Sequence, residues 1–380
     1  MIEFLLLGVF TGVILGLLPG FHINNIIPFF SAIPFASENL LVFLVSSSVA
    51  FTFSSFFPSI LLGAPNDDTA LSVLPGHRLV LNGKGRTALF ASFYGGILSL
   101  FFSTVMLLFF ATIMPQIYDF LRIAIPFLLI FIMSVLVLTD NLLPAMLVVI
   151  ISGLLGYLTF NENLLLPLLT GFFGLSTLII SYNSNAKVPK QYETHKSFLS
   201  RYQALRISLL SAFLGSIFNI IPAISSSITA FVGKFFGNFK AEEYLLFMGG
   251  TNVTYMVFSF YAFMLLGNVR SGSAALFSQI YSTQSLLFVV GIALLSGILA
   301  AMTCLQITGR IIELYYKFDY RKVSLFAMVF LISVVGLFTG FRGLTVLFAS
   351  TSIGLLANFL KVRRSNCMAA LIVPTILVLL

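Results

Sequence analysis

Two interruptions of apolar sequence occur twice in this chain, at nearly the same spacing. The first follows residues 12–19 and returns after residues 215–222, an offset of 222 − 19 = 203 residues. The second lies around Gly63 and returns around Gly267, an offset of 267 − 63 = 204 residues. Paired breaks at one repeat distance are typical of membrane transporters whose broken helices line a binding site. We therefore expect the chain to consist of two related halves.

The composition indicates that lipid surrounds most of this chain. Hydrophobic residues make up 59% of the sequence and charged residues only 8%, whereas about 25% of a soluble domain is charged. A helix needs about 20 apolar residues to span a membrane. We expect an all-α polytopic protein of the cell membrane, with broken or re-entrant hairpins at 2–36 and 203–236. It would have about ten full spans, at residues 40–63, 88–114, 118–138, 141–159, 164–182, 244–267, 284–306, 324–341, 343–360 and 366–380.

Basic residues indicate how the chain crosses the membrane. They gather in four short segments, which the positive-inside rule places in the cytoplasm: 77–86, 187–206, 310–322 and 361–364. One repeat length after the first of these, residues 281–290 contain no Lys or Arg. A basic loop in one half thus corresponds to a non-basic loop in the other, as an inverted-topology repeat predicts. We expect repeats at 1–183 and 203–380, a cytoplasmic linker at 184–202 and an N-terminus outside the cell.

The first break of each half carries small polar residues that suit an anion site. A proline inside a helix removes one backbone hydrogen bond, so a new short helix is expected after it. The start of a helix attracts anions through its free amides and its dipole. The alternative is a tight turn between two ordinary helices, with Ser and Asn as caps. The candidate substrate-binding residues are Pro19, Gly20, His22, Asn24 and Asn25 in the first half, and Pro222, Ser225, Ser226, Ser227 and Thr229 in the second.

The second break of the first half carries carboxylates. An ionisable residue within a membrane segment is costly and by default functional. We expect Asp67 or Asp68 to take a coupling proton or Na⁺, unless both only cap the next helix at the membrane surface. The candidate coupling-ion residues at this break are Asn66, Asp67, Asp68 and Thr69.

At the matching break of the second half stand Arg270 and Ser271. A guanidinium group pairs bidentately with carboxylate or phosphate, so Arg270 is a candidate for neutralising a bound anion. It could instead pair structurally with Asp67 or Asp68. Asn252, in the span 244–267, either lines the same cavity or serves close helix packing.

Several short motifs resemble one family of membrane proteins. Residues 61–65 (LLGAP), 74–78 (LPGHR) and 82–89 (NGKGRTAL), the pair Gly95 and Gly96, and residues 249–252 follow one another in the order found in the large membrane subunit of tripartite tricarboxylate transporters, the TctA family. The resemblance implies a cation-coupled carrier of small organic anions, built from inverted repeats with re-entrant hairpins. The compact chain looks more like archaeal members, and Ala223 stands where the second Pro-Gly pair would have its glycine.

The sequence leaves a second function open. Carriers proposed to move polyprenyl-phosphate lipids share the same broad resemblance, so a lipid-phosphate translocase using the same anion site is the alternative. We expect neither enzyme activity nor a cofactor, a metal site or a nucleic-acid partner. An intramembrane enzyme or a channel would need catalytic or filter motifs that the spans lack. A homodimer is possible, and the need for a small membrane subunit or an extracytoplasmic binding protein stays open.

Overall fold

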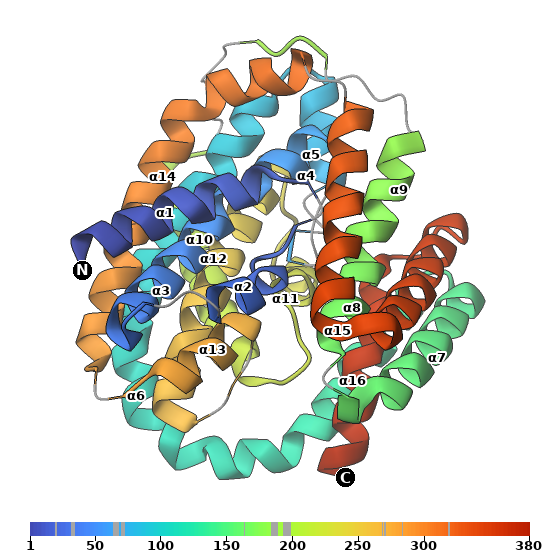
Figure 1. Ribbon diagram of the computed structural model, residues 1–380. Helices are drawn as coiled ribbons and strands as arrows, with labels where there is room; N and C mark the ends of the chain where they lie inside the picture. Colours follow the sequence, from blue (N-terminus) through green and yellow to red (C-terminus); the bar gives the residue numbers. More distant parts are fainter. Residues whose placement is uncertain are drawn as a thin grey trace.

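The structure is a computed structural model that describes residues 1–19, 21–31, 35–63, 68–69, 73–162, 164–183, 189–192, 199–267, 269, 271–282, 284–317 and 320–380. All regular secondary structure in these residues is helical, which confirms the expected all-α class (Figure 1). The first half contains α1 Ile2–Leu17, η1 Ile23–Asn25, α2 Ile27–Ser31, α3 Ser37–Ser54, α4 Phe56–Leu61, α5 Val73–Leu81, α6 Gly85–Leu138, α7 Leu142–Thr159, η3 Phe160–Glu162, α8 Leu165–Leu169, η4 Thr170–Leu175 and α9 Ser176–Asn183. The second half contains α10 Arg201–Ile220, α11 Ser226–Gly233, η5 Lys234–Phe236, α12 Ala241–Leu266, α13 Gly272–Ile280, α14 Leu286–Lys317, α15 Tyr320–Phe359, η6 Arg364–Met368 and α16 Ala369–Leu379.

Six helical segments of the described residues are long and apolar enough to cross a membrane: Ser37–Leu61, Gly85–Gln116, Leu142–Thr159, Arg201–Ile220, Leu286–Lys317 and Arg321–Phe359. Shorter apolar helices accompany them, so the chain is a multi-span helical membrane protein, while the count of ten spans stays a prediction. Two predicted spans, 88–114 and 118–138, lie in the single helix α6, which contains Pro115 and Pro126. Two others, 324–341 and 343–360, lie in α15, which kinks at Gly340, a residue with a φ of 64°.

The helices form two bundles with separate hydrophobic cores. The larger bundle contains α1, α3, α4, α10, α12, α13, α14 and the first part of α6, around residues such as Leu44, Phe57 and Phe260. The smaller bundle contains the second part of α6 with α7, α8, α15 and α16, around Leu129, Phe172 and Ile372. In Figure 1 the smaller bundle lies to the right of the larger one, and α6 runs beneath both. Each half of the sequence therefore contributes helices to both bundles.

Glycines let the helices of the larger bundle approach closely. Gly8, Gly12 and Gly16 are spaced four residues apart on α1 and face α3, where a Cβ on Gly12 would lie 2.2 Å from the carbonyl oxygen of Ser47. Small residues at such spacing are how helices pack in lipid, because apolar side chains gain little from leaving an apolar solvent. Any larger residue at Gly12 would separate α1 from α3.

The two glycine pairs noted in the sequence lie where α6 crosses α12. A Cβ on Gly95 would stand 1.9 Å from the carbonyl oxygen of Leu246, and one on Gly249 would stand 1.9 Å from that of Ser92. The backbones are therefore in direct contact, with no room for a side chain between them. Because α6 belongs to the first half and α12 to the second, this crossing joins the halves at the centre of the larger bundle.

Candidate functional site

The chain breaks at both predicted prolines. The helix α1 ends at Leu17 before Pro19, and only the three-residue η1 and the five-residue α2 follow. The helix α10 ends at Ile220 before Pro222, and the eight-residue α11 follows. These following helices are far shorter than the roughly 20 residues of a span. The course of these segments relative to a membrane stays a prediction.

Two serines at the start of α11 have different roles. Ser225 caps the helix, and Ser226 contacts Asp68. The Ser225 hydroxyl accepts a hydrogen bond from the amide of Ile228 at 3.4 Å. The Ser226 hydroxyl donates to Asp68, whose carbonyl oxygen lies at 3.1 Å and whose Oδ1 lies at 3.0 Å. Ser226 belongs to the second half and Asp68 to the first, so this contact ties the two together.

The opposite end of α11 carries a cation. Lys234 follows the last residue of this helix, and its ammonium group lies 4.6 Å from the centre of the Tyr244 ring. Burial lowers the pKa of Lys234, and the nearby charge of Arg363 lowers it further. A cation at a helix C-terminus complements the negative end of the helix dipole. The positive end of the α11 dipole lies at the other end of the helix, at Ser225.

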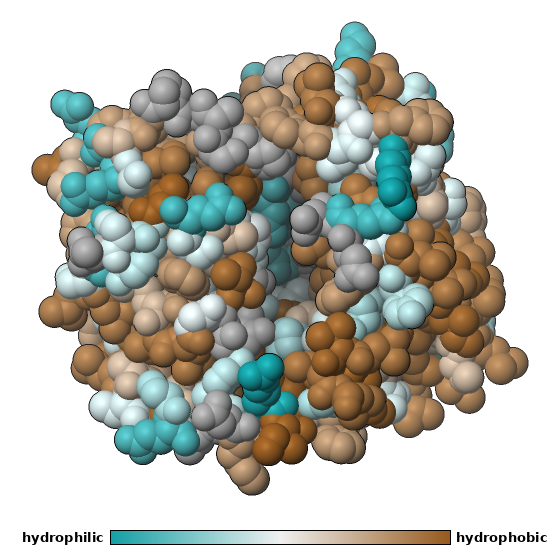
Figure 2. Space-filling view, turned by 60° about the horizontal axis from the view of Figure 1, so that its bottom comes forward, coloured by the Kyte–Doolittle hydropathy of each residue, from teal (hydrophilic) through white to brown (hydrophobic). Residues whose placement is uncertain are grey.

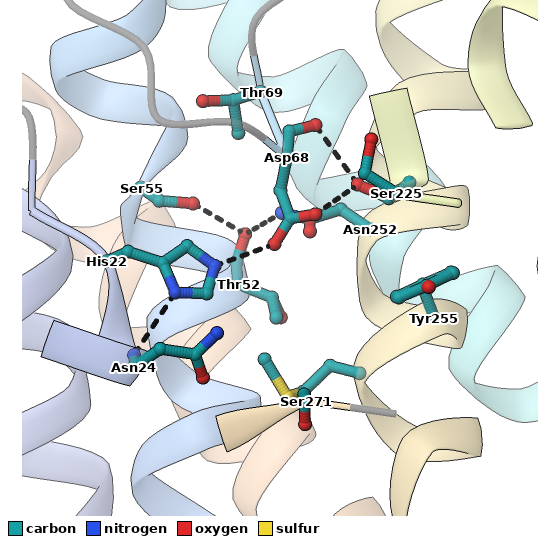
Figure 3. Close-up of polar contacts among 12 residues, drawn as sticks. His22, Asn24, Thr52, Ser55, Asp68, Thr69, Ser225, Asn252, Tyr255 and Ser271 are labelled. Atoms are coloured by element: carbon teal, nitrogen blue, oxygen red, sulfur yellow. Dashed lines mark hydrogen bonds and ion pairs between the residues drawn. The ribbon is translucent and has the colours of Figure 1, made fainter. Parts of the chain in front are cut away.

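His22 and Asp68 form a pair at the same place (Figure 3). His22 Nε2 lies 2.9 Å from Asp68 Oδ2, and His22 Nδ1 accepts a hydrogen bond from the backbone amide of Asn24 at 3.1 Å. Both side chains are largely buried, with exposed fractions of 11% and 13%. Both oxygens of the Asp68 carboxylate therefore have a partner, one in each half of the chain. We call His22, Asp68 and Ser226 the first crossing.

A second crossing, formed by Asn24, Ser271 and Ser273, lies nearby. Asn24 Oδ1 accepts from the amide of Ser273 at 3.3 Å, and the Ser273 hydroxyl accepts from Ser48 at 3.1 Å. Ser271 caps α13 by accepting from the amide of Ala274 at 3.0 Å, and it donates to the Ser259 hydroxyl at 3.4 Å. Here the first break of the first half meets the second break of the second half, and every group is neutral.

A cavity of about 240 Å³ connects the two crossings. Residues from the larger bundle give it polar walls, and residues from η3, α8, η6 and α16 of the smaller bundle give it a mainly apolar wall. Figure 2 shows a face that is hollowed near its centre, with hydrophilic residues deep between two largely apolar masses. The lining residues are His22, Asn24, Asp68, Phe160, Leu165, Leu169, Ala223, Ile224, Ser225, Tyr255, Met256, Ser259, Ser271, Met368, Leu371 and Thr375.

The structure brings some of the candidate residues together and leaves others at the edge. His22, Asn24, Asp68, Ser225 and Ser271 line the cavity, and Ser226 bonds Asp68 directly. The other described candidates are Pro19, Ser227 and Thr229, which are buried; Pro222 in the turn before α11; Asn25 in η1; and Thr69, whose hydroxyl lies 2.6 Å from that of Ser59. Gly20, Asn66, Asp67 and Arg270 lie outside the described residues.

Asn252 has a different neighbourhood from the cavity-lining candidates. Its side-chain amide donates to the carbonyl oxygen of Thr52 at 3.2 Å, and only 3% of the residue is exposed. This contact joins α12 to α3 and does not involve the cavity wall. The sequence allowed two roles for Asn252, lining the cavity or packing helices together. This contact is of the packing kind.

Several lining residues were not among the sequence candidates. Tyr255, which is labelled in Figure 3, donates a hydrogen bond from its hydroxyl to the carbonyl oxygen of Ile224. This bond holds the turn before α11. Leu165, Leu371 and Thr375 come from the smaller bundle. Their sequence surroundings are those of ordinary lipid-facing spans, so no local signal marks them.

Ala223 adopts a backbone conformation that favours glycine. Its φ is 61°, in the left-handed region, and it lines the cavity beside Ile224. It stands 203 residues after Gly20, at the position where the repeated motif would have glycine. A non-glycine residue in this conformation costs roughly 1–2 kcal/mol. The surrounding contacts must supply that energy.

Taken together, these features define a multi-span helical membrane protein with a central polar cavity between two bundles. The comparison with protein families identifies the group: the tripartite tricarboxylate transporter TctA family matches residues 2–369, and the chain belongs to it. This is a family of membrane transporter components.

One curated relative covers the whole chain. It is an uncharacterized protein of Methanocaldococcus jannaschii, MJ1079, which is 30% identical over 390 residues and aligned over 98% of both chains. No solved structure matches this chain.

Proposed function

We propose that this protein is the membrane-embedded carrier of a secondary transport system for small organic anions such as di- and tricarboxylates. H⁺ or Na⁺ would drive the transport. The supporting observation is the cavity between the bundles, which the capped starts of α11 and α13 both line. Ser225 and Ser271, the two capping residues, both line it. Helix N-termini attract anions through free amides and the positive end of the dipole.

The size of the cavity favours a small anion over a lipid. At about 240 Å³ it is smaller than the roughly 300–1,000 Å³ of pockets that bury drug-sized ligands. A polyprenyl-phosphate lipid would fit only with its headgroup inside and its chain elsewhere. We therefore place the lipid-phosphate translocase second and make it an arm of the test. Arg270 follows Val269 and precedes the cavity residue Ser271, and it remains our candidate for a fixed positive charge on the anion.

Asp68 is our candidate for the coupling cation. It is buried, lines the cavity and contacts both halves of the chain through His22 and Ser226. A carboxylate in such a place is costly in a membrane protein and by default functional. Na⁺ would take the carboxylate oxygens as ligands, whereas a proton would be taken up by the pair of Asp68 and His22.

Pairs of equivalent contacts support the inverted repeat. Asn24 of the first half meets Ser273 of the second, and Ser226 of the second half meets Asp68 of the first, close to the positions that an offset of 203–204 residues relates. The packing of Gly12 against Ser47 likewise matches that of Gly215 against Thr251. In this proposal, the two bundles move relative to each other around the cavity and open it to alternate sides of the membrane.

The proposal is tested by a stability screen on the detergent-purified protein. The probes are citrate, succinate, inorganic phosphate and a polyprenyl phosphate, each with and without Na⁺ at two pH values. Unfolding is followed with a thiol-reactive dye, because the two cysteines, Cys304 and Cys367, are both buried. A ligand of the folded state raises its stability by RT ln(1 + [L]/Kd). Stabilisation by citrate or succinate supports the carrier, and stabilisation by the lipid phosphate alone overturns it in favour of the translocase.

A further inference from the structure

The His22 imidazole is held from both ring nitrogens, and this fixes its tautomer. Nδ1 accepts from the backbone amide of Asn24 at 3.1 Å, and Nε2 lies 2.9 Å from Asp68 Oδ2. A backbone amide can only donate, so Nδ1 carries no proton in this arrangement. The ring proton is therefore on Nε2 and is donated to Asp68. In this tautomer the imidazole is neutral, and Nδ1 can take up a proton in exchange for its hydrogen bond to Asn24.

We propose that His22 is the proton-binding group of the carrier, and that protonation of Nδ1 opens the contact between η1 and α13. The inference rests on the proposed transport function and names its coupling group. A proton bound to Nδ1 turns this nitrogen from an acceptor into a donor that faces the donor N–H of Asn24. The hydrogen bond to Asn24 is then lost, while the imidazolium keeps its bond to Asp68. The proton comes from water in the cavity, which His22 lines.

A change at Asn24 reaches α13 directly. Asn24 Oδ1 accepts from the amide of Ser273 at 3.3 Å. The same oxygen lies 3.0 Å from the place where a Cβ on Gly272 would stand, so the side chain of Asn24 fills the space beside the start of α13. Asn24 cannot shift without altering this contact. Because Ser271, at the start of α13, is part of the cavity wall, protonation of His22 changes the shape of the site.

Protonation also changes the charge of the cavity. Among the described residues that line it, Asp68 is the one carboxylate and neither Lys nor Arg is present. The ring of Phe51 has its centre 5.6 Å from that of His22, and the cavity that His22 lines also presents the neutral side chains of Ser225, Tyr255, Ser259 and Ser271. The pair of His22 and Asp68 therefore goes from one negative charge to zero when the proton binds. Of the undescribed neighbours in sequence, Asp67 and Arg270 would add one charge of each sign.

The charge change gives the coupling its sign. An anion binds more tightly next to a neutral pair than next to a negative one. By thermodynamic reciprocity, a bound anion makes His22 bind its proton more tightly by the same factor. Proton and anion would therefore be carried together. The chemistry requires only reversible proton binding at one ring nitrogen.

The test is nitrogen-15 NMR of the histidine side chains in the full-length protein in lipid nanodiscs, titrated between about pH 5 and pH 8, the range in which His charge changes. The chain has only three histidines, so His22→Gln identifies the signals of His22. His77→Gln is the matched control because His77 lies in α5, away from the cavity wall. If His22→Gln does not fold, Asp68→Asn supplies the assignment, because loss of the carboxylate alters only the His22 signals.

The expected result in the absence of ligand is an Nδ1 without a proton at high pH, which gains one as the pH falls. The backbone amide signal of Asn24 should shift with the same midpoint, and Asp68→Asn should move that midpoint to lower pH because the imidazolium loses its counter-charge. A proton on Nδ1 at high pH, or an Asn24 amide that does not follow the ring, would overturn the proposal whatever the protein transports.

A second titration with citrate separates this inference from the transport function. We expect saturating citrate to raise the His22 midpoint, with one pH unit corresponding to about tenfold tighter citrate binding to the protonated form. His77→Gln should show the same rise. Citrate binding that leaves the midpoint unchanged would overturn the role of His22 in coupling. A correct ligand-free titration with no binding of citrate, succinate or phosphate would support the proton switch and contradict the proposed function.

Discussion

The two crossings share one plan but differ in charge. In each, a residue after a first break meets the second break of the other half: Ser226 meets Asp68, and Asn24 meets Ser273. Counting one repeat length from the charged pair gives 22 + 203 = 225 and 68 + 204 = 272, which are Ser225 and Gly272. The second half thus has a hydroxyl and a bare backbone where the first has an imidazole and a carboxylate. Under the proposed repeat, the one titratable pair among these described residues lies in the first half.

In the proposed carrier, the two crossings would therefore have different roles. The neutral crossing supplies a helix start and hydroxyl groups, which can orient an anion at any pH. The charged crossing responds to protons and changes the attraction of the site for that anion. A fully symmetric site would bind protons at two equivalent places and would have no distinct neutral wall.

The largest effect is expected from removing the carboxylate of the charged crossing. Asp68→Ala removes the carboxylate that pairs with His22 Nε2 and one of the two acceptors of the Ser226 hydroxyl. Losing two hydrogen bonds to a charged group, worth about 1.5–3 kcal/mol each, costs about 3 kcal/mol or more. The fall in unfolding temperature of the purified variant measures the effect. A loss no larger than that of Ser273→Ala would show that the two crossings do not differ as described.

A smaller difference should separate two serines, one from each crossing. Ser226→Ala removes a hydrogen bond to a charged group, worth about 1.5–3 kcal/mol, whereas Ser273→Ala removes the neutral hydrogen bond from Ser48, worth about 0.5–1.5 kcal/mol. Ser226→Ala should therefore destabilise the protein more in the same thermal assay. Equal losses would mean that Asp68 carries no charge in the folded protein.

The fit between Asn24 and α13 can be broken from the other side. A Cβ at Gly272 would lie 3.0–3.2 Å from three atoms of the Asn24 side chain. Overpacking of this kind costs about 1–3 kcal/mol, so Gly272→Ala should lower stability and should change the pH response of His22. Gly291→Ala is the matched control, since nothing lies within 4 Å of its added Cβ in α14 and alanine favours a helix by up to about 1 kcal/mol. A neutral Gly272→Ala would show that Asn24 moves freely.

The smallest effect is a gain in stability at the break of the second half. Ala223→Gly should relieve the left-handed strain and stabilise the protein by about 1 kcal/mol. Lys361, with a φ of 56°, provides the comparison outside the cavity, and Lys361→Gly should give a similar gain. If only Ala223→Gly weakens anion binding, the strained conformation of Ala223 contributes to the binding site. If neither variant is stabilised, the strain has been overestimated.

The positions of the breaks could be predicted from the sequence. Pro19 and Pro222 interrupt apolar helices because proline removes a backbone hydrogen bond wherever it stands, and the following Ser225 is a good helix cap in any context. Proline alone was a poorer guide elsewhere: α6 continues through Pro115 and Pro126, where the sequence predicted two spans.

The pairing at the site could not be predicted, because it depends on contacts between distant segments. The sequence presented Asp67 and Asp68 as equivalent and assigned His22 to the substrate. Only the fold brings Asp68 to His22, 46 residues away, and to Ser226, 158 residues away. The smaller bundle's wall was missed for a related reason. Apolar residues such as Leu165 and Leu371 have the same local pattern whether they face lipid or a cavity.

The most direct test of the account is protection of the cavity by its ligand. A cysteine replaces Thr375, which lines the cavity from α16, and a matched cysteine replaces the exposed Ser282 after α13. The native Cys304 and Cys367 are both buried and should react slowly. The rate of alkylation is measured with and without saturating citrate or succinate. With the anion bound, alkylation of the cysteine at 375 should be several-fold slower than without it, and alkylation at 282 should be unchanged. Equal rates at 375 with and without an anion that stabilises the protein would contradict the placement of the site between the two bundles.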